Sequence, residues 1–237
     1  MPEFKKLKGI YSLLDRQTQE FSLACRDKCP DCCTVNVTVT SLEVAYIFSC
    51  LGAGQIRQVM GRLAIGFPKK KYMPSTTVNG FARACMAGEA MTEDENDPDW
   101  GACPLLAHGR CTIYDVRPLG CRVMVSETLC RKSGFARMPP FALTLSNVLA
   151  QALEQVDRKG FTGNFSDVLA AYARAWESRT GPEDRPLYLT LDNIPESDKT
   201  KVFLENYPVP ALMIPPEHRD RAAPLVSEIR ASGCLGK

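Results

Sequence analysis

The chain has 237 residues, of which 45% are hydrophobic and 24% are charged, a balance typical of a globular protein with a buried core. The formal net charge of +2 gives no basis for nucleic-acid binding, and no apolar run reaches the roughly 18–20 residues that a transmembrane helix needs. Residues 1–17 lack the pattern of a signal peptide. We therefore expect a cytoplasmic protein with neither a nucleic-acid nor a membrane partner.

The N-terminal part predicts four helices and one short strand. Apolar residues at helical spacing favour a helix over 7–28, which Pro30 should end because proline disrupts a helix. Alternating β-branched residues predict a strand at 34–40. Thr40 and Glu43 form a capping-box pattern before a helix over 42–51, and further helices are expected at 55–65 and 77–92.

The rest of the chain is rich in turns at first and helical later. Residues 103–122 contain several glycine and proline turn signals, with a small strand expected at 111–114. Helical periodicity is strong over 141–160, and another helix follows with Ser166 or Asn164 as its N-cap. The chain should end in a helix over 218–233 that Pro224 interrupts.

Cysteine is the residue type that most distinguishes this sequence. The chain has 11 cysteines. In a reducing compartment, clustered cysteines are more often metal ligands or catalytic groups than disulfides. Eight of them form two groups and are the candidate metal ligands: Cys25, Cys29, Cys32 and Cys33, then Cys103, Cys111, Cys121 and Cys130.

The first group, in the sequence CRDKCPDCC, has local features that suit a metal site. Residues 29–32 fit a type I turn with Pro30 at its second position, which would hold the ends of the turn within about 7 Å. Adjacent side chains on an extended backbone point in opposite directions. Cys33 therefore either completes one four-thiol site with Cys32 or reaches a second metal.

The available donors restrict the metal. The chain has only two histidines, so the ligands are thiolates, which favour zinc or an iron–sulfur cluster. Four thiolates on Zn²⁺ or on a [4Fe–4S]²⁺ core leave a net negative charge that needs hydrogen-bond donors and cations nearby. Arg117 and Arg122 beside the second group are candidates for that role.

The order of these elements resembles the YkgJ-like cysteine-cluster family of zinc- or iron-chelating proteins. The shared pattern is a cysteine-dense opening that ends in a Cys-Cys pair, a V(T/S)xxE segment, a Cys-Pro-hydrophobic element, and G-x-C-x-I-Y-x-x-R-P-x-x-C-R. The residues that match it are Cys25, Cys29, Cys32, Cys33, Glu43, Cys103, Pro104, Cys111, Ile113, Tyr114, Arg117, Pro118, Cys121 and Arg122.

This resemblance covers residues 25–122 and implies metal binding. One departure is the three-residue gap between Cys25 and Cys29, where many relatives have two. Flagellin lysine N-methylases have a similar cysteine arrangement, which favours an iron–sulfur cluster slightly over zinc. The expected function is thus a thiolate-ligated metal centre with a structural or redox role; no catalytic residue is assigned.

Other classes of protein stay open. The spacing from Cys25 to Cys32 also occurs in radical S-adenosylmethionine enzymes, although a helix rather than a strand is expected before it. The C-x-x-C at Cys29 could serve thiol–disulfide exchange, although a thioredoxin-like site precedes a helix instead of following one. A methyltransferase-like iron–sulfur enzyme and a metal-dependent adaptor or delivery protein, with an unknown protein partner, are further alternatives.

The predicted fold is mostly α with small β elements, an α+β protein in which helices pack around an irregular cysteine-rich metal-binding core. We expect a cysteine-cluster metal-binding domain over 1–135 and a helical C-terminal extension over 136–237 that packs on it. Three cysteines receive no metal role: Cys50 as a buried small hydrophobe, Cys85 as a core or half-exposed packing residue, and Cys234 as a free thiol near a frayed end.

Overall fold

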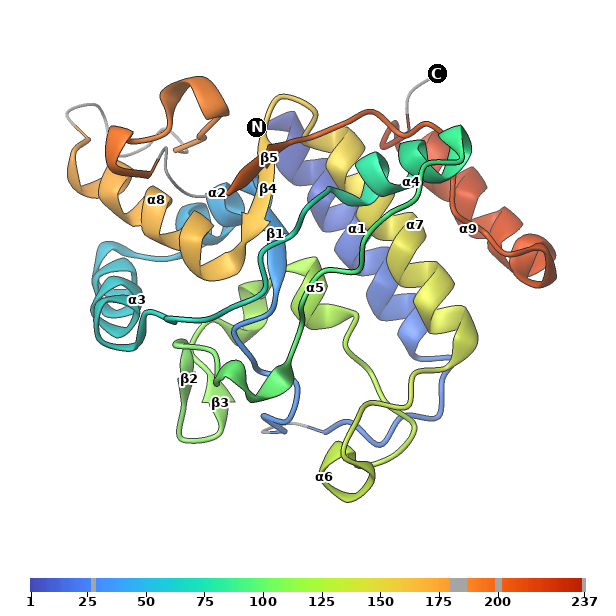
Figure 1. Ribbon diagram of the computed structural model, residues 1–237, viewed down its shortest axis with the longest axis horizontal. Coiled ribbons are helices and arrows are strands. Elements are labelled where there is room, and N and C mark those ends of the chain that lie inside the picture. Colours follow the sequence, from blue (N-terminus) through green and yellow to red (C-terminus); the bar gives the residue numbers. More distant parts are fainter. Residues whose placement is uncertain (27–28, 180–186, 199–201, 236–237) are drawn as a thin grey trace.

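The fold is mostly helical with small antiparallel sheets, the α+β class that the sequence predicts (Figure 1). The computed structural model describes residues 1–26, 29–179, 187–198 and 202–235. Its helices are α1 (Pro2–Thr18), α2 (Ser41–Cys50), α3 (Ala53–Gly66), α4 (Val78–Ala87), α5 (Leu119–Arg122), α6 (Cys130–Ser133), α7 (Pro140–Val156), α8 (Phe165–Glu177) and α9 (Arg219–Ala231). The strands are β1 (Thr38–Thr40), β2 (Leu106–Ala107), β3 (Arg110–Cys111), β4 (Phe161–Asn164) and β5 (Phe203–Glu205).

A three-stranded antiparallel sheet joins distant parts of the chain. Its order is β1-β4-β5, so β4 lies in the middle and Val39 of β1 pairs with Gly163. β2 and β3 form a separate two-stranded hairpin, in which Leu106 pairs with Cys111. The sequence predicts a strand over 34–40 and another at 111–114, but β1 covers only residues 38–40 and β3 only residues 110–111. Strands β4 and β5 carry too short an alternating pattern to be recognised from sequence.

Two clusters of buried apolar residues form the core. One lies among α2, α3, α8 and β4, with Phe161 and Tyr172 fully buried. The other lies among α1, α7 and α9, and Figure 1 shows α1 and α7 side by side. Both clusters contain residues from each side of position 135, so the C-terminal part packs directly against the N-terminal part. A domain boundary at residue 135 stays a prediction.

The start of α2 confirms the capping box. The Thr40 hydroxyl accepts a hydrogen bond from the Glu43 backbone N–H, and the Glu43 carboxylate accepts one from the Thr40 N–H at 2.9 Å. Asn164 is likewise the N-cap of α8, where its Oδ1 accepts from the Ser166 N–H at 2.9 Å. Helix α3 also lies where the sequence predicts it.

The predicted extent of the first helix is wrong. Helix α1 begins at Pro2, which suits a first-turn position, and ends at Thr18 rather than continuing to residue 28. Its buried residues run from Leu7 to Leu14, and residues 15–20 contain no apolar side chain that could anchor a further turn to the core. Residues 22–26 have no regular structure, so Cys25 does not lie on a helix.

Two further expectations also fail. Helix α9 continues through Pro224, because packing of Leu225 and Ile229 against the α1–α7 cluster outweighs the lost backbone hydrogen bond. Cys234 is a free thiol, as predicted, but it is buried rather than at a frayed end, since the chain turns back at Gly233 and inserts it into the same cluster.

The cysteines of the central helices differ from their predicted environments as well. Cys50 is exposed rather than buried, because it lies at the C-terminal end of α2, where Ser49 is exposed as well. Cys85 is exposed on α4, whose buried face consists of Asn79, Ala82 and Ala84.

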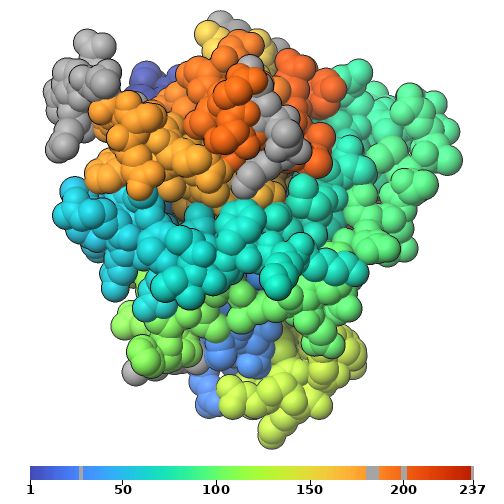
Figure 2. All heavy atoms as spheres, turned by 60° about the vertical axis from the view of Figure 1, so that its left-hand side comes forward, coloured from blue at the N-terminus to red at the C-terminus, as the bar shows by residue number. Residues whose placement is uncertain are grey.

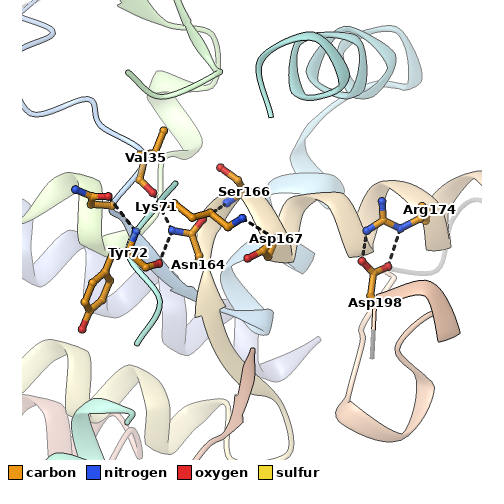
Figure 3. Close-up of polar contacts among 9 residues, drawn as sticks. Val35, Lys71, Tyr72, Asn164, Ser166, Asp167, Arg174 and Asp198 are labelled. Atoms are coloured by element: carbon orange, nitrogen blue, oxygen red, sulfur yellow. Dashed lines mark hydrogen bonds and ion pairs between the residues drawn. The ribbon is translucent and has the colours of Figure 1, made fainter. Parts of the chain in front are cut away.

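Asn164 fixes the chain that follows the first cysteine group (Figure 3). Its side-chain amide donates to the carbonyls of Val35, at 2.8 Å, and Tyr72, at 2.9 Å. Next to it, the Lys71 ammonium forms an ion pair with Asp167 at 3.3 Å. Figure 3 also shows the ion pair between Arg174 and Asp198 on the far end of α8. Buried polar contacts thus tie the segment after Cys33 to β4 and α8.

Candidate metal centre

Seven of the eight candidate cysteines line one cavity of about 310 Å³. They come from segments far apart in sequence, which meet at the lower end of Figure 1 around β2, β3 and α6. Figure 2 shows the same end, where the N-terminal cysteine segment (blue) lies against residues of the second group (green to yellow-green). The lining cysteines are Cys25, Cys29, Cys32, Cys33, Cys103, Cys111 and Cys121.

The turn in the first group is displaced by one residue from its predicted position. The Cys33 N–H donates to the Pro30 carbonyl at 2.8 Å, so the turn spans residues 30–33 rather than 29–32. The Cys103 N–H donates to the Cys33 carbonyl at 2.9 Å, and Thr34 bridges to Ala102. Pairing between these two segments sets the register, and it brings the two cysteine groups together.

The second group is held by short backbone motifs. Backbone N–H groups of Leu105 and Leu106 hydrogen-bond to the Cys103 sulfur, and the Ile113 N–H does the same for Cys111. The β2–β3 hairpin places Cys111 opposite Leu106. Backbone donors directed at sulfur stabilise a thiolate, so both cysteines stand in surroundings that suit a metal ligand.

Cys121 lies on the single turn α5, which packs tightly on β1. A Cβ atom at Gly120 would lie 3.0 Å from Val37 Cγ1 and 3.1 Å from the Thr38 carbonyl oxygen, so a larger residue would push against β1, and this close approach favours glycine. The buried Glu43 carboxylate accepts a hydrogen bond of 2.6 Å from the Leu119 N–H at the start of α5. Glu43 therefore positions the turn that carries Cys121.

Ser126 is a supporting residue that the sequence analysis missed. Its backbone N–H donates to the Cys25 sulfur at 3.2 Å, and its carbonyl accepts from the Ala24 N–H at 2.8 Å. These contacts hold Cys25 without a helix. No sequence motif marks a backbone donor of this kind, so only the tertiary structure could identify it.

The thiols form two overlapping groups, because Cys32 interacts with Cys25 on one side and with Cys33 and Cys121 on the other. A hydrogen bond from the Cys32 thiol lowers the pKa of Cys33, while burial and three nearby thiols raise it: Cys121, Cys103 and Cys111. Burial raises the pKa of Cys25, and nearby Cys32, Cys130 and Cys29 raise it further. We call Cys33, Cys103, Cys111 and Cys121 the inner group. We call Cys25, Cys29, Cys32 and Cys130 the outer group.

Burial favours the neutral form of several of these thiols. It raises the pKa of Cys103 to about 11 and also raises the pKa values of Cys111 and Cys121. The Cys32 pKa is raised by its hydrogen bond to Cys33 and by burial. A metal that binds here must displace protons, as thiolate sites do.

Three arginines line the same cavity: Arg26, Arg117 and Arg122. The charge of Arg117 lowers the pKa values of Cys32 and Cys111. The Arg117 guanidinium also lies over the Tyr114 ring, with 3.9 Å between the guanidinium carbon and the ring centroid. The buried Nε of Arg117 has no hydrogen-bond partner among the described residues. Arg122 donates to the Arg117 carbonyl at 2.8 Å and so supports that loop.

The thiols share a cavity without forming a ready coordination shell. All eleven cysteines are free thiols. Within the described ranges, no three Cys, His, Asp or Glu side chains stand in an arrangement that holds a metal ion. Cys130 is outside the cavity lining, at the start of α6, and interacts with Cys25.

Comparisons with protein families, with curated proteins and with solved structures find no match for this chain. In the part of the chain that the structure describes, no helix has the length and apolar character to cross a membrane. The function must therefore be argued from the cavity itself.

Proposed function

We propose that this protein binds metal through a thiolate-ligated centre at the cysteine-lined cavity, as an iron–sulfur cluster or zinc, with iron–sulfur preferred. The observation that carries the proposal is the convergence of seven thiols on one cavity from four separate stretches of chain, around 25, 29–33, 103–111 and 121. Thiolates are the ligands that zinc and iron–sulfur clusters use. The resemblance of residues 25–122 to the YkgJ-like cysteine-cluster family supports the same assignment.

The surroundings of the thiols fit such a centre. A four-thiolate site carries net negative charge, and it is stabilised by nearby cations and N–H donors. Arg117 supplies a cation and a buried Nε–H that lacks a partner within the described residues. Cys103 and Cys111 already accept backbone hydrogen bonds. An anionic thiolate centre would satisfy that donor, whereas a cavity of neutral thiols leaves it without an acceptor.

The residues that would hold metal are best described as two sets of four. The inner group supplies Cys33, Cys103, Cys111 and Cys121, which interact with one another. The outer group supplies Cys25, Cys29 and Cys130. Cys32 also interacts with Cys33 and Cys121, and we assign it to the outer group because this gives each site four thiolates. Cys32 and Cys33 thus belong to different sites, and each site has the four thiolates that zinc or a cluster requires.

The proposed role is structural or redox. The segments that carry the cysteines contain few residues in helices or strands, and metal binding stabilises folds whose loops cannot pack alone. An iron–sulfur cluster would add the ability to accept and release an electron. The bound metal would supply this chemistry, and the described residues would bind it and shield it from solvent.

The experiment is metal analysis together with an absorption spectrum on protein purified without oxygen. Bound iron with equivalent sulfide and visible absorption supports the iron–sulfur form, and a colourless protein with bound zinc supports the zinc form. A stably folded protein that carries neither metal, even after reconstitution with iron and sulfide or with zinc under reducing conditions, would overturn the proposal.

A further inference from the structure

A second cavity, of about 640 Å³, lies on the opposite side of α5 from the cysteines. Leu119 and Gly120 of this turn line the second cavity, whereas Cys121 and Arg122 line the first. Its other walls come from β1, from the start of α4, from the loop over 91–96, and from one face of α7. Its volume is in the range of pockets that hold small organic molecules.

The lining of this cavity combines carboxylates, hydroxyls and aromatic rings. No lysine, arginine or histidine lines it among the described residues. Ser146, Asn147 and Ala150 present one face of α7 to it, and the rings are those of Tyr72 and Phe81. Its four carboxylates come from α2, from the loop over 91–96 and from α7, and are Glu43, Glu93, Asp94 and Glu154.

Two of the carboxylates, Glu43 and Glu154, are buried and serve the fold, whereas Glu93 and Asp94 are more accessible. Glu154 is saturated, since it accepts from the Thr77 hydroxyl and from two backbone N–H groups, and Glu43 is saturated as well. Glu93 is exposed and has no hydrogen bond or ion pair within the described part of the chain. Asp94 accepts from the Tyr72 hydroxyl at 2.9 Å and the Ser75 N–H at 3.0 Å through a single oxygen.

Asp94 is also held in its charged form. Hydrogen bonds from Ser75 and from Tyr72 lower the pKa of its carboxyl. Phe81 is 41% exposed and Met91 is 38% exposed, so the cavity has an apolar surface next to these two carboxylates. Aromatic faces and carboxylates attract organic cations, and a site without basic residues repels anions.

We propose that this cavity binds a small organic cation, a protonated amine carried on an apolar or aromatic body. The apolar body would contact the wall that contains Phe81 and Met91, and the ammonium group would approach Glu93 and Asp94. The rings give the site a preference for a cation over a neutral molecule of the same shape. This binding site does not depend on the proposed metal centre, because none of the eight candidate cysteines lines it.

Three matched probes test the class of ligand on the full chain. 2-Phenylethylamine, 2-phenylethanol and 3-phenylpropionate have similar bodies and differ in charge, and calorimetry or NMR titration measures their dissociation constants. We expect the amine to bind about tenfold more tightly than the alcohol and the carboxylate to show no saturable binding. Equal affinity for amine and alcohol, preference for the carboxylate, or no saturable binding of the amine would overturn the proposal.

Variants locate the binding. Glu93→Gln should weaken amine binding several-fold and leave alcohol binding unchanged, and adding Asp94→Asn should bring the amine to the affinity of the alcohol. Glu93→Gln disturbs no contact in the described structure, so its result does not depend on refolding. Glu89→Gln, an exposed carboxylate outside the cavity, is the control and should leave all three probes unchanged. Ala150→Phe should block the cavity, and amine binding that survives both this change and Glu93→Gln would place the ligand elsewhere.

Discussion

The Glu43 carboxylate accepts a hydrogen bond of 2.6 Å from the backbone N–H of Leu119, 76 positions later in the chain. The same carboxylate caps α2 through Thr40 and accepts from the Tyr11 hydroxyl at 3.0 Å. One buried side chain therefore joins α1, α2 and the turn that carries Cys121. The capping residue of a helix and the geometry of the cysteine-lined cavity are thus physically linked.

Glu43→Gln should destabilise the protein and disturb this cavity. All the groups that surround the carboxylate are donors, so an amide would place its own N–H groups against at least one of them. We expect a loss of about 2 kcal/mol in the free energy of unfolding, measured by urea denaturation, together with lower metal retention. Glu89→Gln, on the surface, should change neither; if Glu43→Gln also changes neither, Glu43 does not position α5.

Asp157 gives the fold an unusual dependence on pH. Its carboxyl is buried and accepts hydrogen bonds from Ser41, Leu42 and Tyr188, and burial raises its pKa to about 7 from an ordinary value of 3.8. The folded state therefore binds a proton that the unfolded chain releases in this range, so stability falls as pH rises from about 4 to about 7. A shift of this size corresponds to at most about 4 kcal/mol. Denaturation curves at pH 4.5, 6 and 7.5, taken on one buffer system, measure this slope.

Asp157→Asn distinguishes the contribution of Asp157 to this pH dependence from the contributions of the other buried carboxylates. Asparagine cannot ionise, so the variant should lose most of the decline in stability between pH 4.5 and 7.5. Burial also raises the pKa values of Glu43 and Glu154, and these should leave a smaller slope of the same sign. An unchanged slope in Asp157→Asn would show that Asp157 does not titrate in this window.

Single cysteine variants test the division into two groups. Cys33→Ser should remove the metal of the inner group, and Cys25→Ser should remove that of the outer group, each lowering the metal content by about half. Cys50→Ser is the control, since Cys50 is exposed and outside the cavity. Loss of all metal in either variant would indicate one shared centre, and full retention in both would exclude these cysteines as ligands.

Arg117→Gln tests the supporting charge. The guanidinium lowers the pKa values of Cys32 and Cys111, so removing it should weaken metal binding by about tenfold, measured by competition with a chelator. Arg110→Gln changes an exposed charge that does not line the cavity and serves as the matched control. Equal chelator sensitivity of the two variants would remove Arg117 from the centre.

Local signals predicted the elements that local interactions determine. The Thr40–Glu43 capping box, the Asn164 cap and the helix around 55–65 need only neighbouring residues, and the structure confirms them. The end of α1, the continuity of α9 and the position of the turn before Cys33 depend on tertiary packing or pairing, so sequence reasoning misplaced them. The predicted environments of single cysteines, such as Cys50 and Cys234, were wrong for the same reason.

The sequence predicted which cysteines belong to the candidate site, but not how they are arranged in space. Residue type and spacing identified eight cysteines, of which seven line the cavity. The meeting of the two cysteine groups depends on how residues 33–34 pair with 102–103. The contributions of Ser126 and Glu43 arise from contacts across more than 70 positions, which no local pattern encodes.

The most direct test of the thiolate centre is the metal and sulfide content of protein purified without oxygen, measured alongside its visible spectrum. We predict bound iron and sulfide with absorption in the visible range, or zinc in a colourless protein, and loss of either on treatment with a thiol-modifying reagent. A folded chain whose eight candidate thiols all react freely, and which neither carries nor takes up metal, would contradict the account.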